Sequence, residues 1–378
     1  MAICAISKWL TGSIILLMVA CKKDGHEPLP PPVSQFDIIT TGVELNLVDN
    51  TYDPVYWIND QRIPLDKGTW YEAFPYGIEK AGTDLYITGM YVDNGNNIGM
   101  PCYWQNGVRQ ELPIDGLSIE IHCGSRDAKW FNNALYILGD VDLAPVIWKV
   151  KGNTITIIPV KDDNTNATEY MSAMNLEVYN NQLYFACSRV LLTATDPEAA
   201  YEVGYWTMDA QEEVSYHAVE GNLKHALCYS MAISNKGVFI AGEYGDGNTA
   251  YFKPAVWSPQ GRMPVVNQVN AANQRINEVQ LDSKGRVYLN ILDYANTQPL
   301  VWKATGNNYE PLSATIPAGA KGYCNNIALY NDKLAYAYTY HLDNKVFAAY
   351  RFNDKQVELK IGNADFLSIH RTSIFPKL

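Results

Sequence analysis

Short apolar segments that end in an aromatic residue recur along the chain, and a polar turn follows most of them. The clearest is Pro101-Cys102-Tyr103-Trp104, which leads into the turn Gln105-Asn106-Gly107. Aromatic anchors fall at positions 57, 104, 148, 206, 257, 302 and 350. A repeat of roughly 40 to 50 residues is typical of solenoids and propellers, in which each repeat is one structural unit.

Each repeat contains a second apolar segment in which aromatic and β-branched residues alternate with smaller ones. Asp84–Gly89 and Ala134–Gly139 are examples, and turn-forming Asn, Asp and Gly residues precede such segments. These patterns predict four short strands per repeat, joined by hairpin turns. Four antiparallel strands of this kind form one blade of a β-propeller.

The two ends of the repeat region complement each other. The N-terminal end, Phe36–Gly42, resembles the second strand of a repeat, and the C-terminal end, Leu367–Phe375, resembles an isolated first strand. Pairing these two segments would complete one blade and remove two exposed sheet edges. With six complete repeats, the sequence predicts an all-β fold, a seven-bladed β-propeller over residues 36–378 that is closed by pairing the N- and C-terminal strands in one blade.

The periodic Trp residues are predicted to pack between neighbouring repeats, because a ligand would not require one in every repeat. Trp70 and Trp130 lie outside the periodic pattern, and an exposed platform for a sugar is the alternative interpretation of these two. The cysteines at positions 102, 123, 187, 228 and 324 lack metal-binding spacing, and we expect them to be small buried side chains.

The composition excludes some classes of partner. The chain has 378 residues, of which 47% are hydrophobic and 18% charged, and its formal net charge is -11. Nucleic acid binding needs a basic surface, so we expect no nucleic acid partner. The chain has no phosphate-binding, dinucleotide-binding or nucleophile motif and no regularly spaced histidines, so we expect neither a cofactor nor a bound metal.

The first 20 residues have the pattern of a secretory signal peptide. Lys8 precedes the apolar run 14–20, which is too short to span a bilayer and ends at Cys21. Met18-Val19-Ala20-Cys21 resembles the bacterial lipobox, which implies that Cys21 is lipidated, becomes the mature N-terminus and anchors the protein to a membrane. A signal peptide cut elsewhere is the alternative. Residues 21–35 include a proline run, which predicts an extended linker.

The segments Tyr56-Trp57-Ile58-Asn59-Asp60 and Tyr103-Trp104-Gln105-Asn106-Gly107 resemble the repeat of a family of Bacteroidetes lipoproteins with Tyr-Trp-Lys-Asn-Gly-type β-propeller repeats. The resemblance extends over the repeat region, and Cys21-Lys22-Lys23-Asp24 is similar to the start of such lipoproteins. The family implies an exported outer-membrane lipoprotein, on the cell surface or on the periplasmic face. It implies no catalytic residues.

Propellers bind ligands where their inner strands converge on the central channel. Aligning the repeats places one residue pair from each at the same depth: Tyr76-Gly77, Arg126-Asp127, Met174-Asn175, Tyr229-Ser230, Asn277-Glu278, Asn325-Asn326 and His370-Arg371. Planar amide and guanidinium groups suit a polar ligand such as a sugar. The candidate ligand-binding residues are therefore Arg126, Asp127, Asn277, Glu278, Asn325, Asn326, His370 and Arg371. The alternative is that these groups bond to one another and to channel water.

These observations leave three interpretations of function. The first is an exported, lipid-anchored binding or interaction module for a glycan or protein ligand at the channel mouth. The second is a carbohydrate-active hydrolase or lyase, in which Asp127 and Glu278 would be the paired carboxyls. The third is a structural scaffold without a small ligand. An exposed Trp70 or Trp130 beside a shallow rim would favour the first, and a deep pocket with two facing carboxylates would favour the second.

Overall fold

The computed structural model describes residues 35–46, 50–69, 72–92, 98–114, 123–142, 144–160, 167–171, 174–191, 201–245, 252–263, 274–293, 299–305, 308–362 and 366–377. The predicted signal peptide, Cys21 and the linker before residue 35 lie outside this part. Residues Phe36–Leu378 form one unit, and all its regular elements within the described ranges are β-strands. In these ranges, none of the chain forms a helix long and apolar enough to cross a membrane.

The first sheet contains both ends of the repeat region. Seven of its eight strands follow the order β29-β1-β2-β4-β5-β6-β7, and β3 pairs with β2. The bounds of these strands are β1 Phe36–Asn46, β2 Thr51–Ile58, β3 Gln61–Pro64, β4 Glu72–Ala81, β5 Asp84–Val92, β6 Gly99–Gln105, β7 Val108–Glu111 and β29 Phe366–Pro376.

Five further sheets follow along the chain, and each has four or five strands. The second sheet has β8 Cys123–Phe131, β9 Ala134–Val141, β10 Ala144–Lys151 and β11 Thr154–Pro159. The third has β12 Ala167–Met171, β13 Leu176–Tyr179, β14 Gln182–Leu191, β15 Tyr201–Met208 and β16 Val214–Leu223. The fourth has β17 His225–Ser234, β18 Gly237–Gly245, β19 Lys253–Ser258 and β20 Gly261–Met263. The last two have β21 Gln274–Leu281, β22 Val287–Asp293, β23 Leu300–Thr305, β24 Asn308–Ser313, β25 Lys321–Tyr330, β26 Lys333–Leu342, β27 Lys345–Phe352 and β28 Lys355–Glu358.

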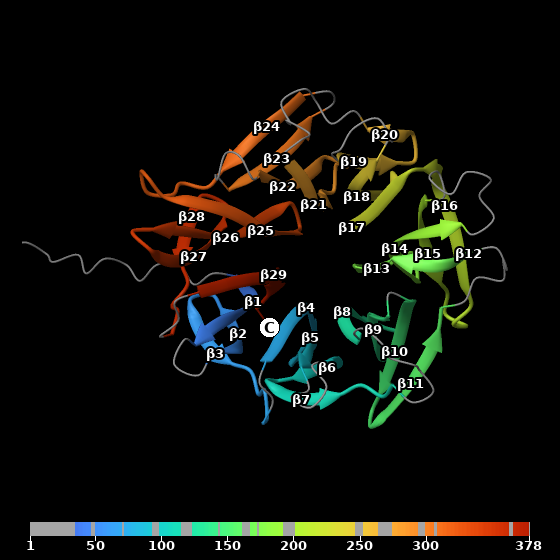
Figure 1. Cartoon of the computed structure of the whole chain (residues 1–378), viewed down its shortest axis with the longest axis horizontal. Helices are drawn as coiled ribbons and strands as arrows, with labels where there is room; N and C mark the ends of the chain where they lie inside the picture. The colour runs from blue at the N-terminus through green and yellow to red at the C-terminus, as the bar shows by residue number, and fades with distance from the viewer. Residues whose placement is uncertain are drawn as a thin grey trace, which may run out of the picture. The chain divides into compact units, whose positions relative to one another are not determined.

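The sheets are arranged as a β-propeller, with one strand of each repeat nearest the centre (Figure 1). The predicted count of seven separate blades is not reproduced. In the described part of the chain, five sheets are separate blades, and the first sheet, with eight strands, contains the remaining repeats. The cause is one parallel bridge between Tyr52 of β2 and Glu72 of β4, which joins the first two repeats into a single sheet.

The predicted pairing of the two ends of the chain is present. β1 and β29 form an antiparallel ladder that runs from Phe36 opposite Pro376 to Leu45 opposite Phe366. Both strands therefore have a hydrogen-bonded neighbour where an open arrangement would leave an exposed edge. The closure of the ring depends on this ladder, which involves no covalent bond.

Asparagine residues form the predicted hairpin turns. Asn106 adopts a left-handed backbone conformation with φ 52°, which asparagine tolerates better than most residues. Its Oδ1 accepts a hydrogen bond from the N–H of Leu85 at 2.9 Å, and Asn59 accepts one from Ile38 at 3.1 Å. Each side chain thereby ties the turn after the Trp strand to the strand beside it.

The periodic tryptophans pack as expected in most repeats, since five are fully buried: Trp57, Trp104, Trp148, Trp206 and Trp257. Trp302 is partly buried. The indole Nε1 of Trp148 donates to the Pro113 carbonyl at 2.8 Å, in the preceding repeat. Burying an aromatic side chain removes about 150–250 Å² from water, an upper-limit gain of about 4–6 kcal/mol. The five described cysteines are buried and free, as predicted.

Candidate functional site

Seven inner strands surround the centre of the propeller, namely β4, β8, β13, β17, β21, β25 and β29 (Figure 1). Each contacts the next one around the ring, and β29 contacts β4. In the described structure, six of them carry a β-bulge, for example between Ser125 and Asp127 of β8. The bulges give the extra residues Arg126, Tyr229, Asn277, Asn325 and His370 a different direction from their neighbours. The predicted alignment of these positions is therefore correct.

At five of the aligned positions, a side chain connects its blade to the next. Asp127 Oδ2 accepts a hydrogen bond from the backbone N–H of Leu176 at 3.0 Å. The same contact recurs at four more interfaces: Asn175 accepts from Met231 at 2.6 Å, Ser230 from Val279 at 3.3 Å, Glu278 from Ile327 at 2.7 Å and Asn326 from Thr372 at 2.7 Å. We call these five contacts the inter-blade clamps. Three of the five acceptors, Asp127, Glu278 and Asn326, are residues that the sequence suggested for ligand binding.

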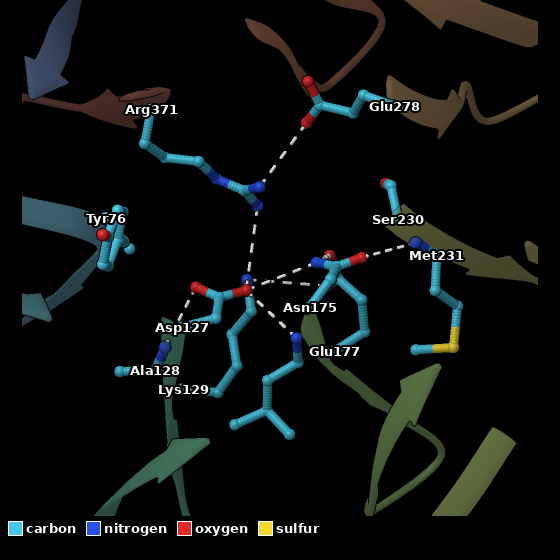
Figure 2. A network of polar contacts seen from close by, with 12 residues as sticks. Tyr76, Asp127, Ala128, Lys129, Asn175, Glu177, Ser230, Met231, Glu278 and Arg371 are labelled. Atoms are coloured by element: carbon cyan, nitrogen blue, oxygen red, sulfur yellow. Dashed lines mark hydrogen bonds and ion pairs between the residues drawn. The ribbon is translucent and has the colours of Figure 1, made fainter. Parts of the chain in front are cut away.

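The series of clamps stops at the two aligned positions that have no acceptor side chain, Arg371 and Gly77. At Gly77, β4 lies close against β8, since a Cβ there would be 2.7 Å from the Cα of Asp127. Arg371 extends across the channel between two carboxyl groups (Figure 2). Its guanidinium is 3.8 Å from Asp127 Oδ2 and 3.6 Å from Glu278 Oε1. Both distances exceed that of a hydrogen bond, so each contact is an ion pair only.

Asp127 and Glu278, the predicted carboxyl pair, are buried, with 2% and 3% of their surface exposed. Besides its clamp, Glu278 accepts from Asn326 Nδ2 at 2.7 Å and from Gln280 Nε2 at 3.3 Å. Asp127 Oδ1 accepts from the N–H of Ala128 at 2.9 Å. Burial raises the pKa of Glu278 to about 7, although Arg371 opposes the shift. All four carboxyl oxygens therefore already have partners within the protein.

The other candidates lie towards the upper end of the channel, where the inner strands begin. Arg126 forms an ion pair with Asp140 at 2.6 Å, and its guanidinium lies 5.2 Å above the ring of Tyr76. His370 donates through Nδ1 to the carbonyl of Pro75 at 2.7 Å and stacks on Tyr76. Burial lowers the pKa of His370. These two side chains are therefore held by residues of β4 and β9.

Asn325 and Asn277 occupy equivalent bulges but differ in their partners. Asn325 Oδ1 accepts from the hydroxyl of Thr339, on the neighbouring strand β26, at 3.2 Å. In the preceding repeat, which contains Asn277, the position equivalent to Thr339 is Leu292. The leucine side chain has no polar group that could bond to Asn277. Asn277 Oδ1 is accordingly buried without a hydrogen-bond partner among the described residues.

A pocket of about 220 Å³ opens at the lower end of the channel, where the inner strands end. We call it the lower pocket. Its polar lining consists mainly of Glu79, Lys129, Glu177, Gln280 and Arg371, from five inner strands. Lys129 Nζ lies 3.6 Å from Glu177 Oε2, and Glu79 Oε1 accepts from the backbone N–H of Trp130 at 3.0 Å. Burial raises the pKa of Glu79 to about 7, and the nearby Lys129 ammonium opposes this shift.

Of these five pocket residues, the sequence analysis named only Arg371. A usable signal was nevertheless present, because Glu79, Lys129, Glu177 and Gln280 each lie two residues after an aligned position. Side chains two apart on a strand lie on the same face. Extending the alignment by two residues along each inner strand would therefore have identified these four pocket residues.

Trp130 follows Lys129 on β8 and is not among the residues that line the lower pocket. Its side chain is 41% exposed and stacks on Tyr86 with ring centres 6.2 Å apart. The exposed-platform interpretation therefore fits Trp130, whereas Trp70 lies outside the described residues. A larger groove of about 520 Å³ lies between the last two separate blades, but the candidate residues do not line it.

The comparisons with known proteins concern the fold alone. No family model and no curated protein matches the chain. Among solved structures, an arabinanase from Penicillium chrysogenum with bound arabinobiose is similar at 11% identity, covering 70% of this chain and 88% of that one, with a TM-score of 0.45. A putative 6-phosphogluconolactonase from Bacteroides fragilis is similar at 10% identity, covering 90% and 99%, with a TM-score of 0.43. A sucrose-6-phosphate hydrolase from Lactobacillus gasseri is similar at 7% identity, covering 80% and 85%, with a TM-score of 0.40.

Proposed function

We propose that the protein is an exported, lipid-anchored binding protein whose propeller holds a polar ligand, a glycan or a polar protein segment, at one mouth of its channel. Residues 1–20 and the lipobox ending at Cys21 support export and anchoring to the outer membrane, on its surface or periplasmic face. We also propose that the eight-stranded sheet is two blades joined at Tyr52 and Glu72, which makes seven blades in total.

The observation that carries the binding proposal is that Arg371, in the lower pocket, has two ion-pair partners but no hydrogen bond to either. Its charge is balanced by Asp127 and Glu278, but neither lies within hydrogen-bond distance. A guanidinium has five N–H donors, and withdrawing them from water without acceptors is costly. A ligand oxygen in the pocket would accept these hydrogen bonds.

The composition of the lower pocket suits a sugar. Lys129 and Arg371 supply donors, while Glu79 and Glu177 supply acceptors, and a sugar hydroxyl can both donate and accept. The volume of about 220 Å³ is below the roughly 300–1,000 Å³ of sites for drug-sized ligands. We therefore propose that the pocket holds a single sugar residue, free or at the end of a glycan.

The alternative, a carbohydrate-active hydrolase or lyase, draws support from Glu278, because a carboxyl with a pKa of about 7 is suited to general acid catalysis. However, Glu278 holds the neighbouring blade through Ile327, and Asp127 does the same through Leu176. Proton transfer at either carboxyl would compete with a clamp. We therefore favour binding over hydrolysis or elimination.

A glycan-array screen on the detergent-solubilised full chain tests this proposal. We expect a defined set of glycans to bind, and Arg371→Gln to reduce that binding at least tenfold. Arg286→Gln is the matched control, because Arg286 pairs with Asp282 away from the pocket. Arrays without a reproducible ligand, or wild-type affinity in Arg371→Gln, would contradict the proposed site. Cleavage of a bound glycan would support the enzyme instead.

A further inference from the structure

The charges around the lower pocket are unequally paired. Arg371 is shared by Asp127 and Glu278, and Lys129 is paired with Glu177. Glu79 remains. It accepts a hydrogen bond from the backbone N–H of Trp130, and no cation lies within ion-pair distance of it among the described residues. Four carboxyl groups thus face two cations, and Glu79, which lines the cavity, is the one of the four that has no ion pair in the described structure.

This inference rests on the proposed binding function. We infer that the lower pocket prefers a sugar that carries a protonated amine beside its hydroxyl groups, with the ammonium placed on Glu79. An ammonium supplies the missing positive charge and donates charge-assisted hydrogen bonds, which are roughly twice as strong as those between neutral groups. A neutral sugar would leave Glu79 without an ion-pair partner.

The remaining walls of the pocket fit the rest of such a ligand. Arg371 offers its N–H donors to ring or hydroxyl oxygens, and Gln280 can both donate and accept. Apolar residues of β25 and β29, including Leu329 and Ile374, line the same cavity. They can pack against the C–H face of a sugar ring. One ligand can therefore satisfy the carboxyl, the guanidinium and the apolar wall together.

The protonation of Glu79 supports this preference. Burial raises the pKa of Glu79 to about 7, and Asp127 and Glu177 raise it further, while Lys129 and the Trp130 N–H lower it. A bound ammonium would stabilise the carboxylate form and lower this pKa. Binding near pH 7 should therefore release protons from the protein, which a neutral sugar would not cause.

Isothermal titration calorimetry with glucosamine, N-acetylglucosamine and glucose at pH 7 tests the inference on the full chain. We expect glucosamine to bind at least about tenfold more tightly than the two neutral sugars, which corresponds to about 1.4 kcal/mol. The observed enthalpy for glucosamine should also depend on the ionisation enthalpy of the buffer, because protons are released. Glu213→Gln is the matched control, since Glu213 is exposed and outside the pocket.

Two variants should move the preference in opposite directions. Glu79→Gln keeps an acceptor for the Trp130 N–H but removes the charge, so the affinities for glucosamine and glucose should converge. Lys129→Met removes the competing cation, so the ratio should increase. Equal affinity for charged and neutral sugars in the wild type would overturn the inference and leave the binding proposal intact. If none of the three sugars binds, the single-sugar site itself is wrong.

Discussion

The substitution Asn326→Ala tests whether the inter-blade clamps hold the ring closed. Asn326 lies on β25 and is 4% exposed. Its Oδ1 accepts from the N–H of Thr372, on the closing strand β29, and its Nδ2 donates to Glu278 Oε2, each at 2.7 Å. Alanine removes both bonds. The Thr372 N–H then remains buried without its acceptor.

The magnitude for β29 follows from the Thr372 contact alone, because the bond between Asn326 and Glu278 joins β25 to β21. A buried donor left unsatisfied costs about 1–3 kcal/mol, so we expect β29 to dock about 1–3 kcal/mol less favourably. At 1.4 kcal/mol for each factor of ten, local opening of β29 should increase about 5-fold to 140-fold. β29 is sensitive to this loss because β1 is the one strand with which it forms a ladder in the described structure.

Hydrogen exchange followed by mass spectrometry measures this opening directly. Peptides covering residues 366–376 should exchange faster in Asn326→Ala, while peptides from β8 to β11 should change far less. Asn153→Ala is the control, since Asn153 is exposed in a turn. Unchanged exchange over residues 366–376 would refute the view that this clamp holds the closing strand.

Three further predictions address the anchor, the closure and the buried carboxyl. Cys21→Ala should leave unprocessed precursor and release the protein from the membrane fraction; a variant that still partitions with membranes would count against lipidation. Deleting residues 364–378 should expose the edges of β1 and its neighbours and destabilise the whole propeller, so an unchanged melting temperature would contradict closure by β29. Burial raises the pKa of Glu278 from its ordinary 4.5 to about 7, so the folded state binds more protons than the unfolded state in this interval. Stability should therefore fall as pH rises from 4.5 to 7, and Glu278→Gln should reduce this slope in denaturant titrations; an identical slope would disprove the shift.

The strands and turns could be predicted because they depend on neighbours in sequence. Alternating apolar residues formed the second strands, and Asn59 and Asn106 formed the turns that follow the Trp strands. The pairing of β1 with β29 also followed from the sequence, since each end resembled the half of a blade that the other lacked. The depth alignment of the inner strands was correct because their bulges recur at the same place in most repeats.

Only the tertiary structure decided which of the aligned polar side chains are left without a hydrogen bond inside the protein. Asp127, Glu278 and Asn326 are occupied by backbone N–H groups of the next blade. Every residue except proline carries such a donor, so its position leaves no trace in the sequence. The bridge between Tyr52 and Glu72, which merges two repeats, likewise depends on the distance between strands that local pattern does not encode. The sequence by itself therefore determined the strands of the repeats and the depth of the channel ring, whereas contacts between blades decided which polar groups of that ring are already hydrogen-bonded.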